Sequence, residues 1–470
     1  MLVPVAFTLA FVACAPSDEA PKPEGANTPS QAEAEAQQPL SGEAVDLARL
    51  EGSWRGVLDS PGGELPFSLG FASAAETDAS NSQSSSEAPS LWATVGNGEE
   101  RIEVQAHRDE EGSLVLAFPS YDSEITARAS RTEDGAAAEL SGIWRKTGAA
   151  GQQTRLPFRA ERGEGVRFQA PSAAPLEPAP VSLDGSWSVV FTDEDGTEPA
   201  LGEFQQEGDR LVGTFLTPTG DYRYLVGDYL GGRLRLSTFD GAHAFLFSAE
   251  ASVEDGEPRL TGDFWSRDTY HATWEARPTR EGEEILPDPW TEVRLQQDAL
   301  TFQFPVATGQ DLEIDSPYRY PDARHQGKVV LVNIFGSWCP NCNDEAPLLA
   351  RWHREYADQG LEIVGLAYEH SGDLERDRTM VQRFAERHGI EYPLLVAGIS
   401  DKSAAGETLP ALSSVKAYPT SIFVGRDGEV QRIHSGFAGP GTGEHHQRLV
   451  AELEEQLLDL LAQPAAGGAP

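Results

Sequence analysis

The hydrophobic pattern changes its period along the chain. Residues 46–277 contain short runs of alternating apolar and polar positions, separated by turn signals such as Asp255-Gly256. Alternation with a period of two predicts half-buried antiparallel strands. From Leu300 onward, continuous apolar runs alternate with segments whose apolar residues recur every three or four positions. That order predicts strands and helices in turn, and therefore an α/β domain that follows an all-β region.

The all-β region contains an internal repeat. The run LEGSW at 50–54 recurs as LDGSW at 183–187, and LSGIW at 140–144 recurs as LTGDFW at 260–265. The matches keep the same order in both copies, which indicates a duplicated β unit. We therefore predict a multidomain chain with two antiparallel β-barrel-like or sandwich-like repeats, followed by the α/β domain. The repeated tryptophans are core residues on this interpretation, and contact with a ligand is the alternative.

The second repeat also contains two unusually aromatic segments, residues 220–225 and 237–245. Aromatic pairs across antiparallel strands explain them without any further role. The alternative hypothesis is that this face contacts the C-terminal domain or a partner.

Shifts in composition predict how the chain is divided. We expect a signal peptide at 1–14, a tether at 15–45, β repeats at 46–164 and 180–277, linkers at 165–179 and 278–297, and the α/β domain at 298–465. The tether is rich in Ala, Pro, Glu, Gln and Ser and cannot bury enough apolar surface to order itself.

Cys339 and Cys342 form a Trp-Cys-x-x-Cys motif between a predicted strand and a predicted helix. The preceding run 329–335 is apolar apart from Asn333, which is typical of a strand buried on both faces. The segment 343–359 has helical spacing. The first cysteine should therefore lie at the helix N-terminus, where free N–H groups and the helix dipole favour the reactive thiolate. The spacing predicts a redox-active dithiol.

Two other roles for the cysteine pair fit the sequence less well. A structural zinc site needs four ligands, and the whole chain has three cysteines. A purely structural disulfide over this spacing closes almost no loop and would stabilise little.

The C-terminal third of the chain resembles a known family. The run WCPNC at 338–342, Pro347, Asn333 in the preceding strand, YPT at 418–420 and RDG at 426–428 are similar to the TlpA/ResA-like thiol-disulfide oxidoreductases. That group has a thioredoxin fold within the redoxin (AhpC/TSA) superfamily, and its members are exported. The resemblance implies an oxidoreductase that uses its own dithiol and no other cofactor or metal.

The resemblance also implies roles for individual residues. Cys339 would attack the substrate disulfide, and Cys342 would resolve the mixed disulfide. Pro419 would be cis and lie against the cysteines, so that its neighbourhood pairs with the substrate backbone. The supporting residues by position in the motifs are Trp338, Pro340, Asn341, Pro347, Tyr418 and Thr420.

Asn333 takes the place of the strand aspartate that assists proton transfer in thioredoxin itself. Asparagine cannot accept that proton, so another group would take the proton of Cys342. Glu345 and Glu369 are the candidates. Solvation at the surface is the ordinary alternative for both carboxylates.

The chain starts with a short apolar run that ends in Cys14. Residues 11–14 (FVAC) resemble a bacterial lipobox, in which the cysteine is lipidated. Phe11 stands where leucine is usual, and no Lys or Arg precedes the run, so an ordinary cleaved signal is the alternative. We expect export as a periplasmic, cell-envelope lipoprotein of a Gram-negative bacterium, attached to the membrane only through this lipid.

The formal net charge is -39, from 75 Asp and Glu against 36 Lys and Arg. This charge disfavours nucleic acids and anionic membrane surfaces as partners. The expected partners are disulfide-bonded proteins and a membrane electron donor, with reduction as the favoured direction. The alternatives are a peroxiredoxin-like peroxidase, although Gly336 stands where that group has threonine, and a binding lipoprotein whose β repeats carry the main role. The sequence predicts no oligomeric state.

Overall fold

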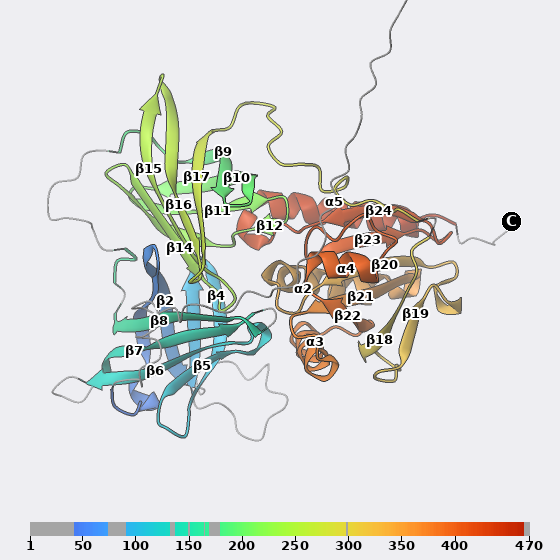
Figure 1. Cartoon of the computed structure of the whole chain (residues 1–470), viewed down its shortest axis with the longest axis horizontal. Helices are drawn as coiled ribbons and strands as arrows, with labels where there is room; N and C mark the ends of the chain where they lie inside the picture. The colour runs from blue at the N-terminus through green and yellow to red at the C-terminus, as the bar shows by residue number, and fades with distance from the viewer. Residues whose placement is uncertain are drawn as a thin grey trace, which may run out of the picture. The chain divides into compact units, whose positions relative to one another are not determined.

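The first eight strands close into an antiparallel barrel. They are β1 (Gly52–Ser60), β2 (Gly63–Ser73), β3 (Leu91–Asn97), β4 (Glu100–Arg108), β5 (Leu114–Phe118), β6 (Ser123–Arg131), β7 (Ala137–Thr147) and β8 (Gln153–Arg162). Neighbours in the chain pair with each other, and β1 pairs with β8 to close the ring (Figure 1). The computed structural model describes residues 42–73, 91–131, 137–148, 151–163, 165–168, 179–297 and 299–464.

The next nine strands form a second closed barrel. They are β9 (Gly185–Asp193), β10 (Gly196–Glu207), β11 (Arg210–Thr217), β12 (Gly220–Asp221), β13 (Leu225–Leu230), β14 (Arg233–Phe239), β15 (Ala244–Glu254), β16 (Glu257–Ser266) and β17 (Tyr270–Pro278). Closure comes from the pairings of β17 with β9 and of β10 with β11, and the two-residue strand β12 extends from β11. Both predicted β repeats are therefore barrels.

The repeated tryptophans have the same structural role in both barrels. The indole N–H of Trp54 donates to the carbonyl of Leu50 at 2.8 Å, and that of Trp187 donates to the carbonyl of Leu183 at 3.0 Å. Both rings are 2% exposed and belong to the barrel cores. The core interpretation is correct for these two tryptophans.

The aromatic segment 237–245 joins the two barrels. The Phe239 ring belongs to the core of the first barrel, 4.7 Å from the Phe67 ring and 5.3 Å from the Trp144 ring. The hydroxyl of Ser237 donates to the carbonyl of Pro66 at 2.7 Å. The segment thus does more than pair strands within its own repeat, because it buries an aromatic ring in the neighbouring barrel.

The C-terminal domain is a seven-stranded mixed sheet with helices packed on it (Figure 1). Its strands are β18 (Phe302–Thr308), β19 (Pro317–Tyr320), β20 (Val329–Phe335), β21 (Leu361–Glu369), β22 (Leu394–Ile399), β23 (Thr420–Val424) and β24 (Val430–Ser435). The order is β19-β18-β22-β21-β20-β23-β24, with β20, β21 and β22 parallel to one another. The helices are α2 (Pro340–Tyr356), α3 (Leu374–His388), α4 (Lys402–Thr408) and α5 (Glu444–Leu461).

The domain borders differ from the predicted ones in three places. Glu43 pairs with Ala129 and Val45 is 1% exposed, so the first barrel begins inside the predicted tether. Phe168 of the first predicted linker is buried in the first barrel. Val293 of the second predicted linker is buried in the core of the α/β domain. In each place apolar side chains within a polar stretch find a core to pack on. Cys14 and most of the predicted tether lie outside the described residues.

Among the described residues, no helix combines the length and the apolar character needed to cross a bilayer.

Candidate active site

The cysteine motif lies where β20 passes into α2. Cys339 is the N-cap residue of α2, with extended backbone angles, and its carbonyl accepts from the Asn343 N–H at 3.0 Å. Pro340 fills the first helical position, where the lack of an N–H costs no hydrogen bond. Cys342 follows in the first turn. Both cysteines are reduced and buried, with exposed fractions of 5% and 2%.

The loop that precedes β23 lies against the first cysteine. The Tyr418–Pro419 peptide bond is cis, as expected from the resemblance. The Sγ of Cys339 lies 3.3 Å from the Tyr418 carbonyl oxygen. Thr420 is fully buried, and its hydroxyl donates to the Ala417 carbonyl at 2.8 Å, which fixes the turn around the proline.

Glu345 is buried inside the domain, so the surface interpretation is wrong for this residue. Its carboxylate accepts from the Asn333 amide at 2.7 Å and from the Ser421 hydroxyl at 3.0 Å. Burial raises the pKa of Glu345 to about 7, and the two hydrogen bonds oppose that shift. The pKa of Cys342 is raised well above its ordinary value, by burial first, then by the hydrogen bond to Cys339, with the charge of Glu345 contributing. A carboxyl that titrates near neutral pH is therefore electrostatically coupled to the second cysteine.

Glu369 is also buried, but its partner is the turn before the motif. Its two carboxylate oxygens accept from the backbone N–H of Ser337 at 2.8 Å and from the Ser337 hydroxyl at 2.7 Å. Burial raises the pKa of Glu369 to about 8. These hydrogen bonds hold Ser337, which directly precedes Trp338. Glu369 therefore positions the motif by fixing the Ser337 turn, without contacting the cysteines in these bonds.

Trp338 covers one side of the motif. Its indole N–H donates to the Tyr368 carbonyl at 2.8 Å, and its ring stacks on His370 at 4.4 Å and meets the Tyr418 ring edge-on at 5.5 Å. Burial lowers the pKa of His370 to about 4, and the positive charges of Lys146, Arg267 and Arg376 add to that shift. His370 is therefore neutral at pH 7. The sequence alone gave it no role.

Asn341, between the two cysteines, contacts the second barrel. Its amide donates to the Asp221 carboxylate at 2.8 Å and to the Phe437 carbonyl at 3.0 Å. Three residues later in α2, Asp344 pairs with Arg223 at 2.5 Å. Sequence reasoning missed Asp221 and Arg223, although they lie in the aromatic segment 220–225 that was singled out. Pro347 lies within α2, as predicted from the motif.

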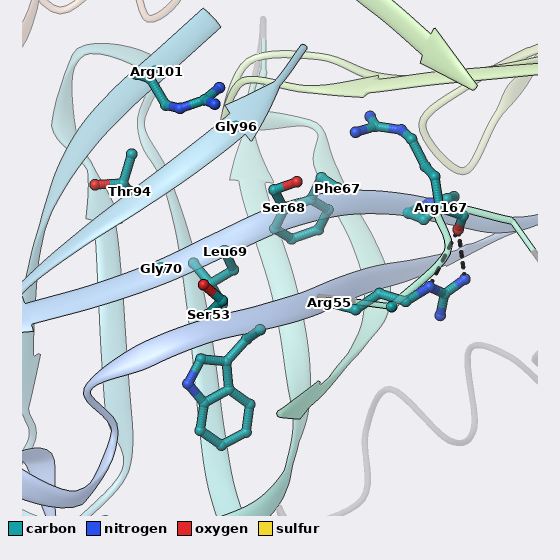
Figure 2. Close-up of a pocket in the computed structure, with 13 residues that line it drawn as sticks. Ser53, Arg55, Phe67, Ser68, Leu69, Gly70, Thr94, Gly96, Arg101 and Arg167 are labelled. Atoms are coloured by element: carbon teal, nitrogen blue, oxygen red, sulfur yellow. Dashed lines mark hydrogen bonds between the residues drawn. The ribbon is translucent and has the colours of Figure 1, made fainter. Parts of the chain in front are cut away.

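Two open pockets lie outside the cysteine motif. A pocket of about 480 Å³ on the first barrel is lined by Arg55, Arg101 and Arg167, among others, and contains no residue of the cysteine motif (Figure 2). Arg167 donates to Asn97 and Ser237 and thereby ties the barrels together. A second pocket of about 540 Å³ lies between the β11–β12 turn and residues 413–416, just before Tyr418. Within the described ranges, no cluster of three or more His, Cys, Asp or Glu side chains is arranged to hold a metal ion.

Comparison with known proteins assigns the α/β domain to a family. The model of the AhpC/TSA family matches residues 295–433. The thioredoxin-like protein YneN of Bacillus subtilis is 31% identical over 147 residues, which is 31% of this chain and 75% of YneN. The thiol-disulfide oxidoreductase ResA of Halalkalibacterium halodurans is 26% identical over 144 residues, covering 30% of this chain and 69% of ResA.

Among solved structures, a putative thiol:disulfide interchange protein DsbE from Chlorobium tepidum matches 36% of this chain and 99% of its own, with 20% identity and a TM-score of 0.27. The sequence matches and the buried cysteine pair at the start of α2 agree with each other. The chain belongs to the TlpA/ResA-like family of thioredoxin-fold thiol-disulfide oxidoreductases.

Proposed function

We propose that this protein reduces disulfide bonds of exported proteins through Cys339 and Cys342. The observation that carries the proposal is the buried cysteine pair at the start of α2, with Cys339 at the N-cap beside the Tyr418 carbonyl. That position places the Cys339 sulfur at the start of the helix and next to the loop that precedes β23.

The reaction proceeds in two exchanges. The Cys339 thiolate attacks one sulfur of the substrate disulfide, forms a mixed disulfide and releases the other substrate sulfur as a thiolate. Cys342 then loses its proton and attacks Cys339 Sγ, which releases the second substrate thiol and leaves an internal disulfide in the enzyme. Two electrons pass from the enzyme to the substrate, and two protons accompany them.

Glu345 accepts the proton of Cys342 in this scheme. Its pKa of about 7 lets it exist in both protonation states at neutral pH. The raised pKa of Cys342 keeps this thiol protonated until the mixed disulfide has formed. Asn333 donates to the Glu345 carboxylate and so orients it. Asn333 thus positions the acceptor that the thioredoxin aspartate would otherwise supply.

The sequence supports a proposal for the setting of the reaction. We propose export, attachment through a lipid on Cys14, and electron supply from a donor in the membrane. Without such a donor the internal disulfide would end the cycle after one turnover.

The reduction potential tests this function. The full chain with Cys14→Ser, which leaves only the dithiol, is equilibrated against dithiothreitol and glutathione buffers. A reductase should have a potential near that of thioredoxin, about -270 mV. A value near about -120 mV would reverse the direction and make the protein a disulfide donor. Absence of a two-electron couple would refute the dithiol mechanism.

A further inference from the structure

The segment 220–224 of the second barrel, here called the barrel loop, lies against the start of α2. It follows β11 and includes the short strand β12. The AhpC/TSA match begins at residue 295, so the barrel loop lies outside the part of the chain that the family model describes.

Asp221 is the centre of the contact with the dithiol. Its Oδ2 accepts from the Asn341 amide at 2.8 Å and from the Gly439 N–H at 2.6 Å, while its Oδ1 accepts from the Arg223 N–H at 2.7 Å. All three hydrogen bonds end on one carboxylate that is 6% exposed. Charge-assisted hydrogen bonds of this kind are about twice as strong as neutral ones. One side chain of the barrel therefore holds Asn341, one of the two residues between the cysteines.

Arg223 makes the second contact. Its guanidinium pairs with Asp344 of α2 at 2.5 Å and with Glu100 of the first barrel at 2.6 Å, and it lies 3.2 Å from Asp240. The residue is 8% exposed and has a left-handed backbone with φ of 59°. A single buried cation thus links both barrels to the active-site helix.

The two surfaces fit without spare room. A Cβ atom at Gly220 would lie 2.9 Å from the Asn341 Oδ1, and a Cβ atom at Gly439 would lie 2.6 Å from an oxygen of Asp344 and 3.0 Å from one of Asp221. Neither approach is possible for a real side chain unless a neighbour moves. The barrel loop therefore leaves no gap above Asn341.

The first barrel meets the α/β domain as well, through α3. Arg376 pairs with Asp122, and the Arg387 guanidinium donates to the Ser120 hydroxyl at 3.0 Å. Cys339 is 5% exposed, and its Sγ lies 3.3 Å from the Tyr418 carbonyl oxygen of its own domain. The barrel loop covers Asn341, two residues further along the motif. Thiol-disulfide exchange requires the attacking sulfur to reach the substrate sulfur directly. The sulfur of a folded protein cannot reach a nucleophile buried to this degree.

We propose that the barrel loop is a latch over the dithiol, and that a protein substrate reaches Cys339 only when the contacts of Asp221 and Arg223 release. This inference rests on the proposed function and adds the access step that precedes the first exchange. The latch consists of polar, charged contacts, and interfaces between domains of one chain that are polar permit relative motion. The barrels therefore control which molecules meet the cysteines, rather than serving only as a spacer.

Access to Cys339 can be measured directly. The reduced full chain with Cys14→Ser is treated with a polyethylene-glycol maleimide and, separately, with iodoacetamide, and the rate of modification is followed by mass. Asp221→Ala should raise the rate with the large reagent at least about tenfold, with Asp221→Asn between it and the parent. Gly439→Ala should raise the rate of modification too. This substitution is in the α/β domain, and its methyl group would push the carboxylates of Asp221 and Asp344 out of place. Gly439 has φ of -71°, so its backbone accepts alanine.

The matched control is Asp228→Ala. Asp228 is a partly buried aspartate of the same barrel, and it forms an ion pair with Arg235. It should leave the rate unchanged. Equal rates in the parent, Asp221→Ala and Gly439→Ala would overturn the latch. Asp221→Ala that loses its fold, seen as a lost circular dichroism spectrum, leaves the decision to Gly439→Ala. Loss of the two-electron couple in the parent would instead refute the proposed function, so the two failures are distinguishable.

Discussion

Replacing Glu345 with glutamine should make the stability of the α/β domain less dependent on pH. Glutamine keeps the shape of the side chain, can accept from the Asn333 amide, and cannot ionise. The carboxyl of Glu345 is 3% exposed and has a pKa of about 7, against 4.5 when free. Because the pKa is higher in the folded protein than in the unfolded chain, ionisation of Glu345 favours unfolding. The carboxyl costs no stability below pH 4.5, where both states are protonated. The free energy of unfolding then falls as the pH rises from 4.5 through about 7.

The size of the effect follows from that shift. A change from 4.5 to about 7 corresponds to about 3 kcal/mol between the fully protonated and the fully ionised protein. This is a large share of the free energy of unfolding of one domain, which is about 5–15 kcal/mol. Wild type should lose about 3 kcal/mol more than Glu345→Gln between pH 4.5 and pH 8, because the variant lacks this titration.

Hydrogen exchange measured by mass spectrometry can isolate the domain that responds. Peptides from β20 and α2 of the reduced protein are followed at pH 5 and pH 8, and the opening free energies are compared after correction for intrinsic exchange rates. Glu355→Gln is the matched control, because Glu355 is an exposed residue of the same helix and its replacement changes the charge equally. If Glu345→Gln and wild type lose the same stability, Glu345 titrates as an ordinary carboxyl, and its role as the proton acceptor for Cys342 is refuted.

Three further outcomes are expected. Cys342→Ser should accumulate a mixed disulfide with a protein substrate on non-reducing gels, whereas Cys339→Ser should form none; a trapped adduct on Cys339→Ser would exchange their roles. Glu369→Gln should remove a loss of stability that wild type shows as the pH rises from 4.5 through about 8, since burial raises this pKa; equal pH profiles in exchange of the 336–338 turn would contradict this. Phe239→Ala should destabilise the barrels by about 3–5 kcal/mol in urea unfolding, because the ring is fully buried. Val253→Ala, at a residue 52% exposed in the same barrel, should change stability by less than about 0.5 kcal/mol. Similar midpoints for both variants would contradict the role of the Phe239 ring in joining the two barrels.

The sequence pattern predicted the elements better than their assembly. Period-two alternation and the repeated Trp positions predicted two β units, and the apolar run 329–335 predicted the central strand β20. The run contains one polar residue, Asn333. That anomaly was the available signal for a buried polar partner, because an amide inside a core needs one, and the partner is Glu345. Helix α4, with seven residues, was too short to produce a recognisable period.

The contacts of the barrel loop could not be predicted from local pattern. Asp221 and Asn341 are 120 positions apart, and neither residue type in isolation indicates burial. From the sequence, Arg223 would be expected at the surface. In the folded chain three separate segments bring Glu100, Asp240 and Asp344 to its guanidinium. Hydrophobic periodicity reports which face of an element is buried, and it carries no information about which domain buries a polar side chain.

The position of the latch has a thermodynamic consequence for the dithiol. Asn341 lies between the cysteines, so the turn that the Cys339–Cys342 disulfide would close is the turn that Asp221 holds. Two events that share a contact have a reciprocal coupling free energy: if docking of the barrel loop favours the reduced pair, then oxidation weakens docking by the same amount. A tenfold preference of the docked loop for one redox state would shift the potential by about 30 mV relative to Asp221→Ala. Equal potentials in the parent and Asp221→Ala, together with faster modification of the variant, would mean that the latch controls access without sensing the redox state.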